Sequence, residues 1–184
     1  MDETAARFGF RRVTSAEAEA LRGQDNQAVI RALGVPMWKL PRIGAHLKRR
    51  AAEAPPPPLF PGIPDLLRRL HAAGHRLAIA SSNTEAQIRR SLGPELAGLI
   101  GHFAAEASLF GKAHRFRRLL RASGTEPGAA IAIGDEVRDI EAARQAGIAA
   151  GAVSWGYAWP SLLAARKPDA IFITPEEIAR ALGA

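Results

Sequence analysis

One segment decides the fold: residues 129–147, AAIAIGDEVRDIEAARQAG. Its first five residues form a continuous apolar run, which predicts a short strand that is buried on both faces. Gly134 and Asp135 end that run, and residues 136–146 follow a helical pattern that Gly147 closes. A buried strand that leads directly into a helix is typical of parallel α/β folds.

The same alternation extends over most of the chain. Uninterrupted apolar strands that alternate with helices predict an α/β fold with a Rossmann-like parallel sheet, covered by helices on both faces. Ligands bind such sheets at the carboxyl ends of the strands, so the residues that follow each strand are candidates for a functional site. We expect strands at 76–80, 129–133, 149–154 and 169–173, and helices at 65–70, 85–92, 112–122, 136–146 and 176–182.

A run of four prolines at residues 55–58 separates this region from a different pattern upstream. Consecutive prolines continue neither a helix nor a central strand, so they predict a stiff linker. The residues before the linker have helical patterns and no expected strand. We therefore expect a small helical cap subdomain at 1–56 and an α/β core at 57–184.

Two helix starts can be placed within the expected cap. Thr14 and Glu17 have the spacing of a capping box, and Asp25 can cap the next helix. We interpret Met37 and Trp38 as packing residues of this subdomain rather than as contacts to a substrate.

The composition of the 184 residues is that of an ordinary globular protein, with 47% apolar and 23% charged residues. The sequence has no apolar run long enough for a membrane helix and no apolar signal region at its start, so we expect a cytoplasmic protein. Cysteine is absent, which excludes disulfides, thiol catalysis and zinc sites built on thiolates. The net charge of +7 comes from dispersed arginines. Because no nucleic-acid-binding motif accompanies them, a nucleic-acid partner is disfavoured.

Two groups of polar residues follow the expected strands in the first half of the core. Ser81, Ser82 and Asn83 come after the strand at 76–80, where hydroxyls and free N–H groups at a helix start can bind an anion. The alternative is that Asn83 or Thr84 simply caps the helix. Lys112 begins another helix, where a cation opposes the helix dipole and is therefore unexpected unless it serves a site. The alternative is a surface lysine.

The strand at 129–133 leads into the third group. Asp135 lies at the end of the strand, and Asp139 follows one helical turn later on the same face. Two carboxylates placed in this way suit Mg²⁺, which uses few protein carboxylates together with water and phosphate oxygens. The alternative is that Asp135 caps the helix while Asp139 pairs with Arg138 or Arg144.

Taken together, the order and spacing of these groups resemble the haloacid dehalogenase superfamily of phosphohydrolases, on the branch of the phosphoglycolate phosphatases. The resemblance covers nearly the whole chain and includes residues 60–62, 134–143, 152–156 and 167–169. It implies Mg²⁺-dependent hydrolysis of a small phosphorylated metabolite, with no membrane partner, and a helical cap that selects the substrate. Ser81 and Lys112 would be catalytic, Ser82 and Asn83 would help to seat the phosphate, and Asp135 and Asp139 would bind Mg²⁺.

One part of the family pattern has no counterpart in the sequence. The family uses a nucleophilic aspartate in an Asp-x-Asp-x-Thr motif at the end of a central strand. None of the six aspartates here is separated from another by one residue. By resemblance, roughly two dozen residues that carry this strand are missing upstream. A start assigned too late or a clipped chain, a true truncation, and a different nucleophile remain as explanations.

This absence has consequences for function and for assembly. We expect the chain as printed to be inactive, and the alternative function is a non-catalytic phosphate-binding or interaction protein on the same fold. The missing strand would lie between the strands that end at Ser81 and Gly134. We therefore expect these two strands to pair directly, about 4.8 Å apart, or to borrow a strand, which would favour a homo-oligomer.

Overall fold

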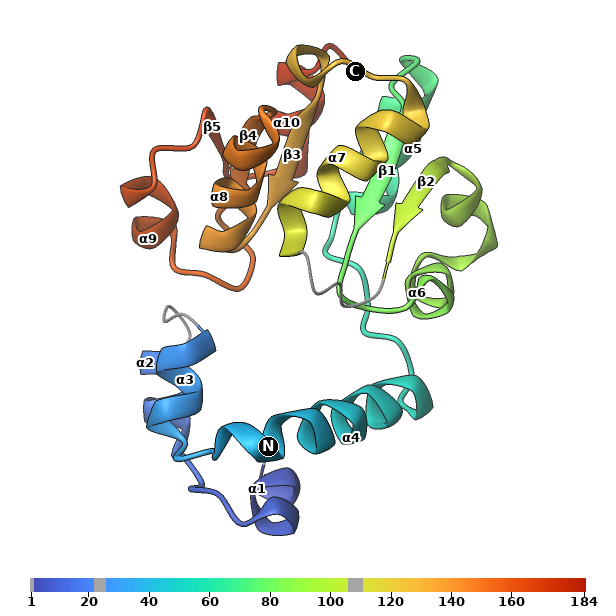
Figure 1. Ribbon diagram of the computed structural model, residues 1–184. Helices are drawn as coiled ribbons and strands as arrows, with labels where there is room; N and C mark the ends of the chain where they lie inside the picture. Colours follow the sequence, from blue (N-terminus) through green and yellow to red (C-terminus); the bar gives the residue numbers. More distant parts are fainter. Residues whose placement is uncertain (1, 22–25, 106–110) are drawn as a thin grey trace. The chain divides into compact units, whose positions relative to one another are not determined.

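The computed structural model describes residues 2–21, 26–105 and 111–184. The chain forms two compact units, Met1–Pro55 and Pro56–Ala184, which Figure 1 shows from blue to red along the sequence. Within the described ranges, no helix is both long enough and apolar enough to cross a membrane.

The first unit is built from helices, as the sequence predicts. Its elements are α1 (Asp2–Phe8), α2 (Ser15–Leu21), α3 (Asn26–Ala32), the 3-10 helix η1 (Met37–Lys39) and α4 (Leu40–Glu53).

The capping box expected at α2 is present in the first unit. The Glu17 N–H donates to Thr14 Oγ1 at 3.2 Å, and the Thr14 N–H donates to Glu17 Oε2 at 2.8 Å. The cap proposed for Asp25 falls outside the described residues. The packing role expected for Met37 and Trp38 is wrong, because their side chains are 71% and 69% exposed. They lie on the single 3-10 turn η1, none of whose residues is buried.

The second unit alternates helices and strands. Its elements are α5 (Ile63–Ala72), β1 (Leu77–Ala80), α6 (Glu85–Gly98), β2 (Ile100–Ala104), α7 (Gly111–Ser123), η2 (Pro127–Ala129), β3 (Ile131–Gly134), α8 (Val137–Ala146), β4 (Ala149–Val153), α9 (Pro160–Ala165), β5 (Ala170–Phe172) and α10 (Pro175–Ala181). The α/β fold class is confirmed. Three of these elements, β2, η2 and α9, were not expected from the sequence.

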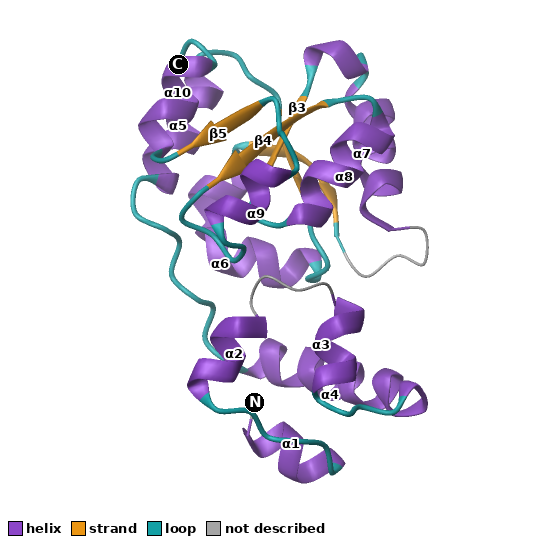
Figure 2. Cartoon of the chain, turned by 90° about the vertical axis from the view of Figure 1, so that its left-hand side faces the viewer, coloured by secondary structure: helices purple, strands orange, loops and turns teal. Residues whose placement is uncertain are grey.

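All strand pairings in the second unit are parallel, and helices cover both faces of the strands. Ala150 and Ala152 of β4 pack with α8 and α9, while Val153 packs with α5 and α10 on the opposite face. Figure 2 shows β3, β4 and β5 side by side. The strand alternation that the sequence predicts therefore places one cluster of apolar residues on each side of the sheet.

The strands form two separate sheets rather than one. Among the described residues, β1 pairs only with β2, and β3 pairs with β4, which pairs with β5. Direct pairing of the strands that end at Ser81 and Gly134, one of our two expectations, is therefore wrong for this chain. The other, a borrowed strand, stays a prediction.

Helices on both sides connect the two sheets. Helix α7 contacts β1 and β2 as well as α8, which packs on β3 and β4. Helix α5 contacts β1 and also α10, which packs on β5. Figure 1 shows α7 in front of β1 and α5 behind it. Both helices thus contact elements on each side of the separation.

Candidate active site

The turn after β3 builds the centre of the candidate site. Gly134 ends the strand, and a Cβ added there would lie 2.6 Å from Asp139 Cβ. Only glycine allows the first turn of α8 to fold so closely over the strand end. The sequence marked Gly134 at the end of the apolar run, and the structure shows why a glycine is needed there, which is the close approach of Asp139.

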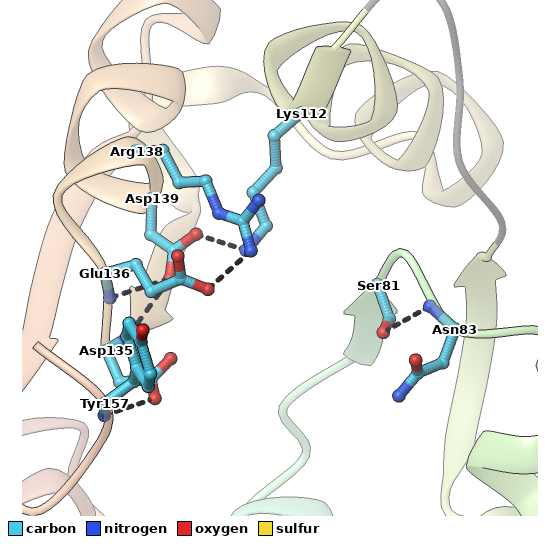
Figure 3. Close-up of polar contacts among 8 residues, drawn as sticks. All are labelled: Ser81, Asn83, Lys112, Asp135, Glu136, Arg138, Asp139 and Tyr157. Carbon is cyan, nitrogen blue, oxygen red and sulfur yellow. Dashed lines mark hydrogen bonds and ion pairs between the residues drawn. The ribbon is translucent and has the colours of Figure 1, made fainter. Parts of the chain in front are cut away.

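Asp139 is the most constrained acidic side chain of the site. It is 4% exposed, and its Oδ2 accepts hydrogen bonds from the N–H groups of Asp135 and Glu136 at 3.1 and 3.2 Å. Its Oδ1 forms an ion pair with Lys112 Nζ (Figure 3). Both carboxylate oxygens are thus engaged by the protein, and the pairing expected with Arg138 or Arg144 as an alternative is not formed among these contacts.

This ion pair explains the unusual place of Lys112 at the start of α7. Its side chain is 23% exposed and reaches across to α8. The interpretation of Lys112 as a mere surface residue is therefore wrong. A partly buried ammonium held beside a strand end is well placed to neutralise an anion that arrives there.

Asp135 accepts hydrogen bonds from the loop that follows β4. Its Oδ2 accepts the Tyr157 N–H at 2.8 Å, and its carbonyl oxygen accepts the Ala158 N–H at 3.0 Å. Gly156 permits this contact, because a Cβ there would lie 2.6 Å from Asp135 Oδ2. Sequence reasoning missed this use of Gly156 and Tyr157. The available signals were a glycine three residues beyond the end of β4 and its place in 152–156, one of the stretches that carry the family resemblance.

Asp135 does not cap helix α8, which was the alternative interpretation. Glu136 occupies the N-cap position. No hydrogen bond involves Asp135 Oδ1 among the contacts of the described residues. This oxygen therefore differs from both oxygens of Asp139, which the protein already engages.

The polar residues after β1 form a separate group. Ser81 Oγ accepts the Asn83 N–H at 3.1 Å, while Ser82 and Asn83 are exposed. Thr84 caps α6, since its Oγ1 accepts the Gln87 N–H at 3.2 Å. This leaves Ser81 to Asn83 outside the helix cap. Figure 3 shows Ser81 and Asn83 apart from the cluster around Asp135, without a hydrogen bond between the two groups.

Two arginines lie close to this cluster. Arg138 pairs with Glu136 at 2.5 Å, and the Nε of Arg115, on α7 one turn after Lys112, is buried without a hydrogen-bond partner among the described residues. Burial lowers the pKa of Arg115, and the charge of nearby Arg138 lowers it further. Arginine nevertheless stays protonated in proteins. Its side chain therefore adds positive potential beside Lys112.

The carboxylate oxygens of this cluster meet part of what a hard cation such as Mg²⁺ requires. Within the described ranges, no group of three or more histidine or acidic side chains is arranged to hold a metal ion. Mg²⁺ needs few protein oxygens because it keeps several waters and takes phosphate oxygens. One oxygen of Asp135 meets that modest requirement, with Asp139 directly behind it.

Comparison with known proteins identifies the family. The family model for haloacid dehalogenase-like hydrolases matches residues 1–153. The chain belongs to this family. It is 32% identical over 177 residues to a phosphoglycolate phosphatase of Synechococcus elongatus, an alignment that covers 95% of this chain and 84% of that protein. The resemblance inferred from the strand ends is confirmed.

Solved structures confirm the fold. A haloacid dehalogenase-like hydrolase from Streptococcus pneumoniae superposes with a TM-score of 0.79 at 21% identity, covering 97% of this chain and 86% of that chain. CbbY from Rhodobacter sphaeroides, solved in complex with phosphate, gives a TM-score of 0.69 at 24% identity over 96% of this chain and 85% of that chain.

Proposed function

We propose that the second unit of this haloacid dehalogenase-like chain binds Mg²⁺ and the phosphate group of a small phosphate monoester. The observation that carries the proposal is the cluster of Lys112, Asp135 and Asp139 at the carboxyl end of β3. That edge is where parallel α/β sheets bind ligands. The similarity to a phosphoglycolate phosphatase supports phosphate-ester hydrolysis as the reaction class. The cytoplasm as the location stays our proposal from the sequence alone.

Each residue has a physical role in this proposal. Asp135 Oδ1 holds the cation, while the backbone N–H of Tyr157 fixes the other oxygen of the same carboxylate. Asp139 positions Lys112, which faces the phosphate. Mg²⁺, when bound, neutralises charge on the phosphate oxygens. Phosphoryl transfer depends mainly on such positioning and neutralisation.

Ser81 and its neighbours complete the phosphate site. The Ser81 hydroxyl donates to a phosphate oxygen, and the backbone N–H groups of Ser82 and Asn83 orient the group. For Asn83, this requires its N–H to leave Ser81 Oγ, the acceptor that it has in this structure. The exchange costs little, since one hydrogen bond replaces another, and bonds to a charged acceptor are the stronger kind.

We further propose that the chain as printed does not turn over phosphate esters. The printed sequence has six aspartates but no Asp-x-Asp-x-Thr motif. Of the two at the site, Asp139 already pairs with Lys112, and our proposal assigns Asp135 to the cation. The alternative function, phosphate binding without catalysis, rests on the same absence. Activity of the 184-residue protein on p-nitrophenyl phosphate with Mg²⁺, lost in Asp135→Ala, would contradict this proposal. Adding an upstream Asp-x-Asp-x-Thr strand should create activity.

Binding can be tested without turnover. Calorimetric titration of Mg²⁺ into the protein with inorganic phosphate should show weak binding that Asp135→Asn reduces more than Asp139→Asn. We expect about tenfold for Asp139→Asn, as for residues that position a ligand, and more for Asp135→Asn. Asp65→Asn, an equal charge change on an exposed side chain, is the matched control. Equal losses at positions 135 and 139 would refute the assigned roles.

A further inference from the structure

We propose that the side chains of Tyr157 and Trp159 form an aromatic platform for the leaving group of the substrate, a role that rests on the proposed phosphate site. The substrate is then a phosphate monoester whose leaving group carries an aromatic ring. Both residues belong to the loop that connects β4 to α9.

The loop carries the platform directly beside the carboxylate that would hold the cation. The Tyr157 N–H donates to Asp135 Oδ2 at 2.8 Å (Figure 3), and the Ala158 N–H donates to Asp135 O at 3.0 Å. Gly156 lets the loop come this close, because a Cβ there would lie 2.0 Å from Asp135 Cβ. A leaving group attached to a phosphate at this carboxylate therefore lies next to the loop that carries Tyr157 and Trp159.

Burial alternates along this loop and turns both aromatic side chains outward. Gly156 and Ala158 are buried, and Ala158 packs in the core cluster of α8, β4 and α9. Tyr157 and Trp159, at the alternate positions, are 50% and 42% exposed. Side chains two residues apart in such an alternation lie on the same side of the segment. The two rings thus share the outer face of the loop.

A third aromatic residue of the same loop shows what packing would look like. Trp155 is partly buried and packs against the cluster that contains Leu66 and Phe172. Among the described residues, neither Tyr157 nor Trp159 belongs to a hydrophobic core cluster. Neighbouring apolar groups left exposed beside a polar site are typical of a surface that contacts a ligand.

The remaining polar groups of the loop favour an aromatic ring over a sugar. A sugar is held through hydrogen bonds to its hydroxyl groups, but the N–H groups of Tyr157 and Ala158 already donate to Asp135. What the loop presents outward is two side-chain rings. Aromatic rings attract one another in offset or edge-to-face contacts, in addition to the area that they bury. A flat aromatic leaving group therefore matches the platform.

Three phosphate monoesters test the platform on the full 184-residue protein. Phenyl phosphate carries an aromatic ring, cyclohexyl phosphate carries a ring of similar size that is not aromatic, and methyl phosphate carries no ring. Binding is measured by calorimetric titration with Mg²⁺ present, and the dissociation constant of methyl phosphate is divided by that of phenyl phosphate. Because the esters share the phosphate group, a change in the cation site alone cancels in this ratio.

We expect phenyl phosphate to bind at least about fivefold more tightly than methyl phosphate and at least about twofold more tightly than cyclohexyl phosphate. Tyr157→Leu and Trp159→Leu should each lower the methyl-to-phenyl ratio at least about twofold, since leucine keeps apolar area but has no ring. Tyr157→Phe should keep the ratio of the parent protein. Ile171→Ala, which removes an exposed apolar side chain of β5, is the matched control and should also keep it.

Several results would overturn the platform. A ratio near one in the parent protein would do so, and so would a ratio that persists in both leucine variants. Equal binding of phenyl and cyclohexyl phosphate would refute the aromatic leaving group. Failure of the phosphate site itself is distinguishable, because then neither methyl phosphate nor inorganic phosphate binds with Mg²⁺, and the platform is refuted together with the site.

Discussion

Replacing Gly134 with alanine should destabilise the second unit strongly, because Asp139 occupies the space of the new methyl group. The added Cβ would lie 2.6 Å from Asp139 Cβ. Overpacking costs about 1–3 kcal/mol. Moving Asp139 away also sacrifices a hydrogen bond from the N–H of Asp135 or Glu136 to the carboxylate, worth about 1.5–3 kcal/mol. We therefore expect a loss of at least about 2.5 kcal/mol in the free energy of unfolding.

Urea unfolding can measure this loss in the second unit alone. In a Trp38→Phe background, the fluorescence comes from Trp155 and Trp159. With a slope of about 2 kcal/mol per M urea, the midpoint should fall by about 1.2 M. Gly101→Ala in β2 is the matched control, because its Cβ would meet nothing closer than Leu77 O at 3.7 Å.

A second background separates the steric clash from other effects of the substitution. Asp139→Gly removes Cβ, Cγ and Oδ2, the atoms that a methyl group at position 134 would meet. In that background, Gly134→Ala should cost no more than Gly101→Ala, giving a large coupling energy between positions 134 and 139. A cost of Gly134→Ala within about 0.5 kcal/mol of the Gly101→Ala control in the parent protein would refute the reasoning.

Two further predictions concern helix α6 and the first unit. Thr84→Ala should destabilise the second unit by about 1 kcal/mol through loss of the capping box. Asn83→Ala, the control, should change the free energy of unfolding by less than about 0.5 kcal/mol. Equal urea midpoints for the two variants would contradict this assignment. Burial lowers the pKa of His46, helped by the surrounding arginines at positions 7, 49 and 50 and opposed by the carboxylate at position 3. The unfolded chain therefore binds the proton more readily, and stability of the first unit should fall as the pH drops below about 6.5. His46→Leu should flatten this dependence in urea titrations followed by circular dichroism, while His71→Gln, at an exposed site, should leave it intact.

The sequence by itself determined the local structure and the family. Thr14 and Glu17 form their capping box because the pattern needs only residues three positions apart. The turn at Gly134 is local in the same sense, and so is the strand before it. Strand β2 was missed because Gly101 and His102 interrupt an apolar stretch that has no clear period. Helix α9 was missed because six residues are too few for a helical pattern.

The tertiary structure decided how the site is assembled, because those contacts join residues far apart in the sequence. Lys112 meets Asp139 only because α7 packs against α8, and Tyr157 reaches Asp135 only because the loop after β4 folds over β3. It also kept Ser81 apart from this cluster. The arrangement of the strands belongs here as well: only the tertiary structure shows that β1 and β2 form one sheet and β3, β4 and β5 another, with α5 and α7 each in contact with elements on both sides.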